Sequence, residues 1–305
     1  MFTRIPRPLI IALFALAAVA LLAIASVRQN QSSRDILIRP APPADHRIAY
    51  GSNEFQFGEL RLPKGAGPHP VAIIIHGGCW MSQYGLSYMG HLSAALTELG
   101  VATWSIEYRR VGNQGGGWPG TFEDASRAAD HLRAMAKSHP LDLKRVVAVG
   151  HSAGGHLALW LASRKHLPKE SPVYSSDPLP LGGVVSLAGI TDLRRAGTAC
   201  DESVPQLMGG SAQDKAAIYN QASPIELLPL GIPYAIVQGD SDTIIPLAMA
   251  KDYADAAKKK GDNAKLAVIE KAGHFEVVDP KSFAWEVVRD EVLALLKTGG
   301  SSGNK

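Results

Sequence analysis

The chain has 305 residues, which is long enough to bury a substantial hydrophobic core without help from disulfides or metals. Hydrophobic residues make up 46% and charged residues 19%, a globular composition that excludes wholesale disorder. The net charge of +3 gives no case for nucleic acid as a partner, which would call for clustered basic residues. Two cysteines are too few for a disulfide scaffold or for a zinc site made of cysteines alone.

The N-terminal segment is strongly apolar. Residues 9–25 form an unbroken apolar run of 17, preceded by Arg4 and Arg7. A basic start followed by an apolar run is typical of an export signal, and small residues at Ala23 and Ala25 offer a cleavage site. Extended to Val27, the run is also long enough to span a bilayer. We therefore expect residues 1–27 to be a signal peptide or an N-terminal membrane anchor, and the protein to be exported: periplasmic, extracellular, or associated with the membrane through residues 9–27.

A polar, proline-rich linker is expected over residues 28–46, followed by alternating strands and helices. Strand patterns occur at residues 55–57, 60–62, 71–75, 101–106, 146–149, 184–187, 234–237 and 266–269. Helical patterns lie near residues 86–99, 122–138, 153–163, 247–260 and 282–296. This alternation predicts one α/β domain over residues 47–297, with a mostly parallel central sheet and helices on both faces. Residues 298–305 are expected to be a flexible tail.

A sharp strand-to-helix turn is predicted at Ser152. The sequence Gly150-His151-Ser152-Ala153-Gly154 follows an apolar strand and opens a helical run. A nucleophile on such a turn has an unusual backbone conformation, and side chains two residues to either side would collide, so glycine is needed at both places. We therefore expect Ser152 to be a nucleophile exposed at the carboxyl edge of the sheet.

An activated serine needs a base, and the base needs an orienting acid. In this architecture the chain order should be serine, acid, histidine. His274 follows a late strand and is the one candidate base in the expected place. Asp242 follows the preceding strand and is the favoured acid, but Asp192 could reach the same histidine in some variants of the fold. Asp240 is expected to cap its turn.

A second glycine-rich loop follows the strand at residues 71–75 and reads His76-Gly77-Gly78-Cys79-Trp80. We expect the N–H groups of Gly78 and Cys79, with that of Ala153, to stabilise the oxyanion of a tetrahedral intermediate, and Gly77 to make the bend of this oxyanion hole. His76 is expected to organise the loop. The Cys79 side chain is expected to pack, and a disulfide with the distant Cys200 cannot be argued from sequence. Trp80 could line the pocket or pack.

Five segments together resemble a known family: HGGCW at 76–80, EYRR at 107–110, GHSAGG at 150–155, GDSDTIIP at 239–246 and GHF at 273–275. They resemble the α/β-hydrolase fold, and within it the esterase/lipase group, with the HGG-x-W form most similar to bacterial feruloyl and acetyl esterases and kynurenine formamidases. The resemblance implies Ser152 as nucleophile, Asp242 as acid, His274 as base, and Gly77, Gly78 and Cys79 in the oxyanion loop. Related hormone-sensitive-lipase-like enzymes usually have a third glycine where this chain has Cys79.

The expected activity is hydrolysis of carboxylic esters through an acyl-enzyme, with no metal or organic cofactor required. The expected partner is a small-molecule or carbohydrate-linked ester. Two alternatives stay open: a kynurenine-formamidase-like amidase, and a non-catalytic binding module tethered to the membrane. A loop-and-helix cap is expected over residues 189–230, and its geometry would set the sizes of the acyl and alcohol groups.

Overall fold

A computed structural model describes residues 33–195, 197–262 and 264–298. The segment predicted as signal peptide or anchor, residues 1–27, lies outside these residues, as does nearly all of the expected C-terminal tail. Within the described ranges, no helix combines the length and the apolar character needed to cross a bilayer.

The centre of the domain is one eight-stranded sheet with strand order β1-β2-β4-β3-β5-β6-β7-β8. The strands are β1 (His46–Ala49), β2 (Phe57–Arg61), β3 (His69–Ile75), β4 (Ala102–Ile106), β5 (Leu141–His151), β6 (Gly183–Leu187), β7 (Tyr234–Gly239) and β8 (Ala264–Ile269). Along this order, every pairing from β4 through β3, β5, β6 and β7 to β8 is parallel. At one edge of the sheet, β1 pairs antiparallel with β2, and β2 pairs antiparallel with β4. The predicted mostly parallel sheet is confirmed, and β1 is a strand that the sequence pattern did not indicate.

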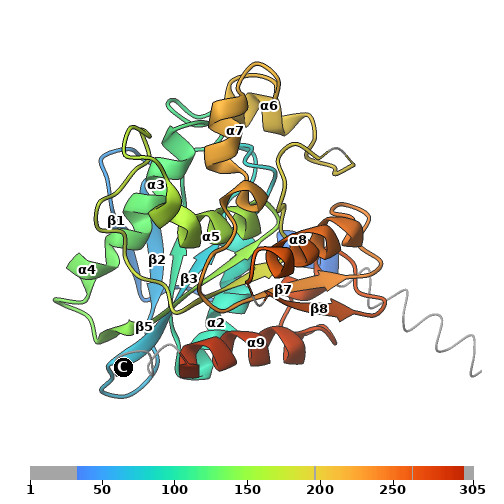
Figure 1. Cartoon of the computed structure of the whole chain (residues 1–305). Coiled ribbons are helices and arrows are strands. Elements are labelled where there is room, and N and C mark those ends of the chain that lie inside the picture. Colours follow the sequence, from blue (N-terminus) through green and yellow to red (C-terminus); the bar gives the residue numbers. More distant parts are fainter. Residues whose placement is uncertain (1–32, 196, 263, 299–305) are drawn as a thin grey trace, which may run out of the picture.

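Helices cover both faces of the sheet (Figure 1). They are α2 (Gly90–Glu98), α3 (Gly120–Asp130), α4 (Leu132–Met135), α5 (Ala153–Ser163), α6 (Ser203–Met208), α7 (Ala216–Ala222), α8 (Leu247–Lys259) and α9 (Trp285–Thr298). Short 3₁₀ turns occur at Asp35–Leu37, Leu86–Met89, Arg164–His166, Pro224–Leu227 and Glu276–Val278.

Alternate residues of the buried strands face two different cores. In β3, Val71, Ile73 and Ile75 belong to the core under α3, α5 and α8, while Ala72 and Ile74 belong to the core under α2 and α9. A strand that is buried on both faces is therefore continuously apolar, as the sequence pattern predicted. The result is a three-layered α/β domain whose strands end at a common edge.

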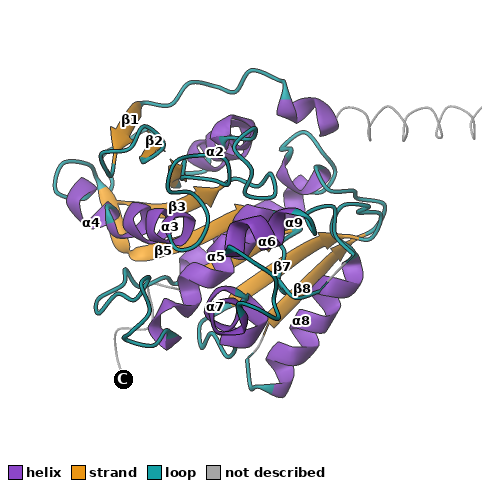
Figure 2. Cartoon of the chain, turned by 90° about the horizontal axis from the view of Figure 1, so that it is seen from above, coloured by secondary structure: helices purple, strands orange, loops and turns teal. Residues whose placement is uncertain are grey.

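Two segments lie above this edge. The short helices α6 and α7 stand over α5 at the top of the view in Figure 1, within the region where a cap was expected. The second segment, residues 33–39, belongs to the stretch expected to be a linker. Its Ile36 side chain is fully buried in the core under α2 and α9, and Arg39 pairs with Asp279 at 2.7 Å. In Figure 2 this segment is the short helix next to the grey trace, and it lies against the rest of the domain. It therefore packs as part of the domain.

Candidate active site

The predicted nucleophile sits on a strained turn between β5 and α5. Ser152 has φ 55° and ψ −121°, a conformation that non-glycine residues rarely adopt. A Cβ at Gly150 would lie 2.0 Å from the Gly154 carbonyl oxygen, and one at Gly154 would lie 2.1 Å from the Ile75 carbonyl oxygen. The two glycines of the motif are thus required by the close approach of backbone to backbone, which is the reason given for them from sequence.

Parallel pairing of β7 with β8 brings the predicted acid and base together. The Nδ1 atom of His274 lies 2.8 Å from Oδ2 of Asp242, and both side chains are buried. A Cβ at Gly239 would lie 2.1 Å from the Ala272 carbonyl oxygen, so glycine at the end of β7 lets the two loops approach each other. Ser152 and His274 line the same cavity, which brings the three predicted residues to one site.

The carboxylate of Asp242 is held by four donors. Its Oδ1 accepts the N–H groups of Ile244 and Ile245 at 2.8 and 2.9 Å. Its Oδ2 accepts Nε2 of Gln238 at 2.9 Å in addition to His274. Burial by itself raises the pKa of Asp242, but the hydrogen bond and charge of His274, with the two backbone donors, bring the pKa below its ordinary value. The side chain is thereby kept ionised beside the imidazole. Gln238 was not singled out from sequence.

The two other candidate acids serve their own turns. Asp192 accepts the N–H of Arg194 at 2.8 Å and lies 3.4 Å from the Ser223 hydroxyl. Asp240 accepts the N–H of Lys271 at 2.7 Å and the Ser241 hydroxyl at 2.9 Å, the capping position expected for it. The carboxylate that meets Nδ1 of His274 is that of Asp242 and not that of either of these residues.

The second glycine loop turns at Gly78, Cys79 and Trp80, which have φ values of 102°, 50° and 55°. The bend was expected at Gly77 but lies at the three residues that come after it. A Cβ at Gly77 would lie 2.8 Å from Cβ of Ser152, so this glycine instead allows the loop to pack against the nucleophile turn. The Gly77 N–H donates to the Tyr88 hydroxyl at 2.6 Å, so Gly77 is not a free oxyanion donor. Gly78 and Cys79 line the cavity with Ser152, and Ala153 begins α5 directly after Ser152.

The Cys79 side chain packs against the hydrophobic core, as expected, but it is not a free thiol. It forms a disulfide with Cys200, 121 positions later, with a Cα–Cα distance of 5.2 Å. Trp80 packs: its side chain is fully buried, with its ring edge-on to His156 at a centroid distance of 5.1 Å.

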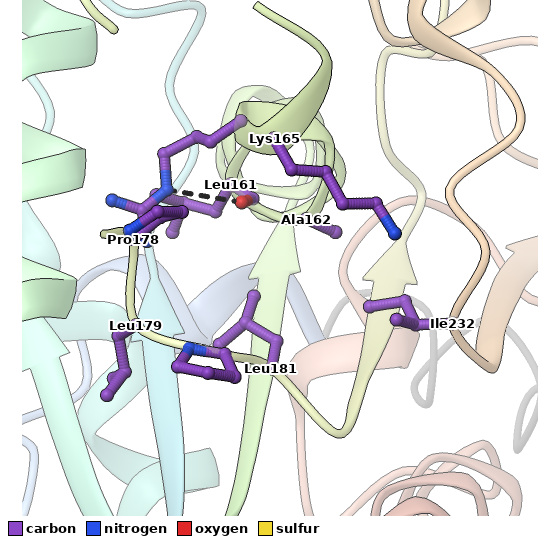
Figure 3. A pocket seen from close by; sticks show the side chains of 9 residues that line it. Leu161, Ala162, Lys165, Pro178, Leu179, Leu181 and Ile232 are labelled. Carbon is purple, nitrogen blue, oxygen red and sulfur yellow. Dashed lines mark hydrogen bonds between the residues drawn. The ribbon is translucent and has the colours of Figure 1, made fainter. Parts of the chain in front are cut away.

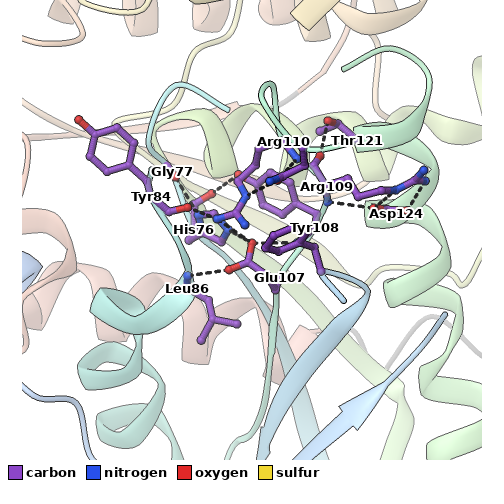
Figure 4. A network of polar contacts seen from close by, with 12 residues as sticks. His76, Gly77, Tyr84, Leu86, Glu107, Tyr108, Arg109, Arg110, Thr121 and Asp124 are labelled. Carbon is purple, nitrogen blue, oxygen red and sulfur yellow. Dashed lines mark hydrogen bonds and ion pairs between the residues drawn. The ribbon is translucent and has the colours of Figure 1, made fainter. Parts of the chain in front are cut away.

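His76 and Glu107 lie behind the loop in a buried polar network (Figure 4). Nε2 of His76 lies 2.9 Å from the Glu107 carboxylate and Nδ1 lies 2.8 Å from the Gly77 carbonyl oxygen. The Tyr108 ring stacks on the imidazole at 4.4 Å, and its hydroxyl donates to the His76 carbonyl oxygen. Burial raises the pKa of Glu107, and the charge of His76 and that of Arg110 more than offset it, so the pKa is lowered. This network organises the loop from behind.

A further buried chain of hydrogen bonds involves His151, the residue before the nucleophile. Its Nε2 lies 2.9 Å from the His274 carbonyl oxygen, which can only accept, so Nε2 carries the proton. Nδ1 then accepts from the Tyr88 hydroxyl at 2.8 Å, and that hydroxyl accepts the Gly77 N–H. Burial, and after it the electrostatic effect of the neighbouring His274 side chain, lowers the pKa of His151 far below its ordinary value, so the ring is neutral. His151 thus joins the loop at residues 76–80 to the backbone of His274.

The cavity at the site has a volume of about 200 Å³. Its walls combine the residues of the catalytic loops with apolar side chains, notably Leu37, Tyr84, Ile244 and Phe275. A second cavity of about 230 Å³, shown in Figure 3, is lined by α5 residues, the 178–181 loop and Ile232. It contains none of the residues proposed here for catalysis, so we assign the chemistry to the first cavity.

Comparisons with known proteins identify a family and relatives for this chain. Residues 59–256 match the BD-FAE family. A probable isoprenylcysteine alpha-carbonyl methylesterase, ICMEL1, from Oryza sativa subsp. japonica is 24% identical over 267 residues, covering 82% of this chain. The aligned region spans only 61% of that relative's length.

Solved esterase structures share the fold at low identity. A truncated carbohydrate esterase from gut microbiota superposes with a TM-score of 0.73 at 19% identity, covering 84% of this chain and 99% of the other. Esterase Est2 of Thermogutta terrifontis, with propionate bound, gives 0.69 at 21%, covering 86% and 97%. Esterase B of Lactobacillus rhamnosis gives 0.73 at 17%, covering 93% and 96%. Because the family match covers most of the chain, this protein belongs to the BD-FAE family.

Proposed function

We propose that the protein hydrolyses carboxylic esters through a triad of Ser152, His274 and Asp242. The observation that carries this proposal is the buried 2.8 Å hydrogen bond between His274 and Asp242 beside the strained turn at Ser152. The Ser152 hydroxyl attacks the ester carbonyl carbon while His274 takes its proton, and Asp242 stabilises the resulting imidazolium. The N–H groups of Gly78, Cys79 and Ala153 bind the oxyanion.

Collapse of the tetrahedral intermediate breaks the bond between the acyl carbon and the alcohol oxygen. The alcohol leaves with the proton from His274, and the acyl group stays on Ser152. A water molecule then gives its proton to His274 and attacks the acyl carbon. The carboxylic acid leaves, and the proton returns to Ser152. The serine, histidine and aspartate side chains thus complete the cycle without a cofactor.

Replacing the nucleophile is the first test. Ser152→Ala should abolish hydrolysis of p-nitrophenyl acetate and butyrate, and should abolish labelling by a fluorophosphonate probe, with little change in thermal unfolding. Ser176→Ala, a serine on an exposed loop, is the matched control and should behave as the unmodified enzyme. Unchanged turnover in Ser152→Ala would refute the triad. An unmodified enzyme that the probe does not label would instead support a non-catalytic binding module.

The choice of acid is tested by two matched amides. Asp242→Asn should lower kcat by about 10⁴, because an amide cannot stabilise the imidazolium or select the correct tautomer. Asp192→Asn changes a residue that is bound to its own turn and should leave kcat within a fewfold of the starting value. A larger loss of kcat at Asp192 would reverse the assignment.

Short acyl groups fit the site best. The cavity of about 200 Å³ is smaller than a pocket for a drug-sized ligand, and its walls are largely apolar. The carbohydrate esterase among the structural neighbours supports a carbohydrate-linked acetyl ester as one substrate class. Acetyl, butyryl, octanoyl and feruloyl esters assayed side by side would rank the acyl groups. Adding N-formylkynurenine to the panel separates the formamidase alternative, which predicts faster cleavage of the amide than of any ester.

We also propose that the enzyme works outside the cytoplasm. The apolar start of the chain and the Cys79–Cys200 disulfide both support this location, since disulfides persist in oxidising compartments. Fractionating cells that express the full chain, followed by immunoblotting and N-terminal sequencing, would show whether the protein is exported and whether the segment before Ser26 has been removed. Recovery of the full-length chain in the cytoplasmic fraction would refute the proposal.

A further inference from the structure

The oxyanion loop has a conformation that its own sequence does not favour. Three consecutive residues, Gly78, Cys79 and Trp80, have positive φ, and two of them carry a side chain. A left-handed conformation is unfavourable for a residue with a Cβ, so it persists only where the surroundings enforce it. Trp80 is held by complete burial, and its carbonyl oxygen accepts the Val111 N–H at 2.8 Å. Cys79 is only half-buried, and the link that fixes its side chain is the disulfide.

The far end of the disulfide is anchored. Cys200 is fully buried, and its N–H donates to the Thr198 hydroxyl at 3.1 Å. The same turn is closed by Asp201, whose carboxylate accepts the N–H groups of Gly197 and Thr198. A sulfur atom attached to this turn has little freedom, so the turn can act as a fixed support for Cys79.

The turn is also connected to the loop of the acid. The Ala199 N–H donates to the Ile244 carbonyl oxygen at 3.0 Å, and the Ile244 N–H in turn donates to Asp242 at 2.8 Å. Ala199 and Ile244 both line the cavity that contains Ser152. The disulfide therefore joins the oxyanion loop to a wall of the cavity that is hydrogen-bonded to the triad acid.

We propose that the Cys79–Cys200 disulfide is a positioning element for the oxyanion hole, which holds residue 79 in its left-handed conformation. Without the link, a residue with a Cβ relaxes toward negative φ, and the peptide groups on either side of it rotate. Those peptide groups carry the N–H of Cys79 and the N–H that follows it, so a proposed donor leaves its place. This inference rests on the proposed ester hydrolysis and assigns to both cysteines a role in the rate of that reaction.

The first test breaks the link from its far end. Cys200→Ala should lower kcat for p-nitrophenyl butyrate by about tenfold to a hundredfold, because a misplaced donor costs up to what its removal costs. KM should change little, since the donor acts on the transition state. Glu202→Ala is the matched control: it changes an exposed side chain two residues from Cys200, outside the contacts that anchor the turn, and keeps the disulfide. Its kcat should stay within twofold.

A rescue variant separates positioning from general stabilisation. Glycine adopts positive φ without penalty, so Cys79→Gly combined with Cys200→Ala should recover most of the kcat that Cys200→Ala loses. If the disulfide merely stabilised the fold, the double variant would be no better than the single one, because glycine at 79 adds flexibility and removes packing. All rates are measured at least 15 °C below the lowest unfolding midpoint of the set.

The proposal would be overturned by an unchanged kcat in Cys200→Ala, or by a loss of kcat that the double variant does not recover. It would also be overturned if neither variant folded, because the disulfide would then be needed for folding alone. If only Cys200→Ala fails to fold, recovery of folding and turnover in the double variant supports it, and absence of turnover refutes it. Failure of the proposed function is a separate result, because it would appear as an unmodified enzyme with no ester hydrolysis above that of Ser152→Ala.

Discussion

The hydroxyl of Tyr88 is the central group of the buried chain between Gly77 and His151, so Tyr88→Phe tests that chain. The substitution removes one oxygen and leaves the ring in place. Two buried partners then lose their hydrogen bonds: the Gly77 N–H and Nδ1 of His151. Leaving a buried donor or acceptor unsatisfied costs about 1–3 kcal/mol, so the two together should lower the free energy of unfolding by about 2–6 kcal/mol.

The assay is thermal unfolding measured together with kcat. For a domain of this size, each kcal/mol shifts Tm by about 2–4 °C, so Tyr88→Phe should unfold at least about 4 °C earlier. Turnover should also fall at a temperature where the variant is folded, because the chain links Gly77 in the oxyanion loop to the backbone carbonyl of His274.

Tyr84→Phe is the matched control. Tyr84 lines the same cavity, but the residue is 42% exposed, so its hydroxyl is accessible to water. It should shift Tm by less than 2 °C. Equal unfolding temperatures for the two variants, with kcat also equal, would refute the reasoning that the buried chain supports both stability and the placement of the loop.

Three further predictions follow from single contacts. Gly154→Ala should abolish turnover, since the new Cβ would lie 2.1 Å from the Ile75 carbonyl oxygen and must displace backbone at the site; wild-type turnover would contradict this. Leu37→Ala should enlarge the cavity and so raise the ratio of kcat/KM for octanoyl esters to kcat/KM for acetyl esters severalfold. Ile38→Ala, one residue away and 84% exposed, should leave this ratio unchanged. Equal ratios in the two variants would exclude Leu37 from the acyl site. Burial lowers the pKa of His156 to about 3, so the unfolded chain binds a proton below pH 6.5 that the folded chain does not. The contribution of His156 to the free energy of unfolding is therefore complete above pH 6.5 and is lost as the pH falls toward 3. At pH 4.5 the loss should amount to about 2–3 kcal/mol. Urea unfolding at pH 7.5 and 4.5 should show a smaller difference for His156→Gln, and an unchanged difference would exclude this group.

The parts of the site that sequence could predict are those governed by local geometry. Gly150 and Gly154 flank a turn whose spacing is imposed by the backbone itself, and the structure shows the collisions that a Cβ would cause at both positions. His274 could be selected because no other histidine follows the late strands. The fold class could be predicted because strand segments buried on both faces are largely apolar, as residues 71–75, 146–149, 184–187 and 234–237 are.

Long-range contacts set the limit of such predictions. Asp192 and Asp242 each follow a strand of the same sheet, and only the path of the two loops decides which carboxylate meets His274. Cys79 and Cys200 are 121 positions apart, so their bond depends on how the chain above the sheet folds back. Tyr88 carries no motif, and its role appears only when its hydroxyl is seen between Gly77 and His151.

The disulfide also changes the connectivity of the chain. It closes a covalent ring from residue 79 to residue 200, which contains Ser152, while Asp242 and His274 lie outside it. Residues 168–170, on the exposed surface, belong to this ring. A protease that cuts the chain once there would open the ring but release no fragment, because the two pieces stay joined through sulfur. The piece that carries Ser152 would remain covalently attached to the piece that carries Asp242 and His274.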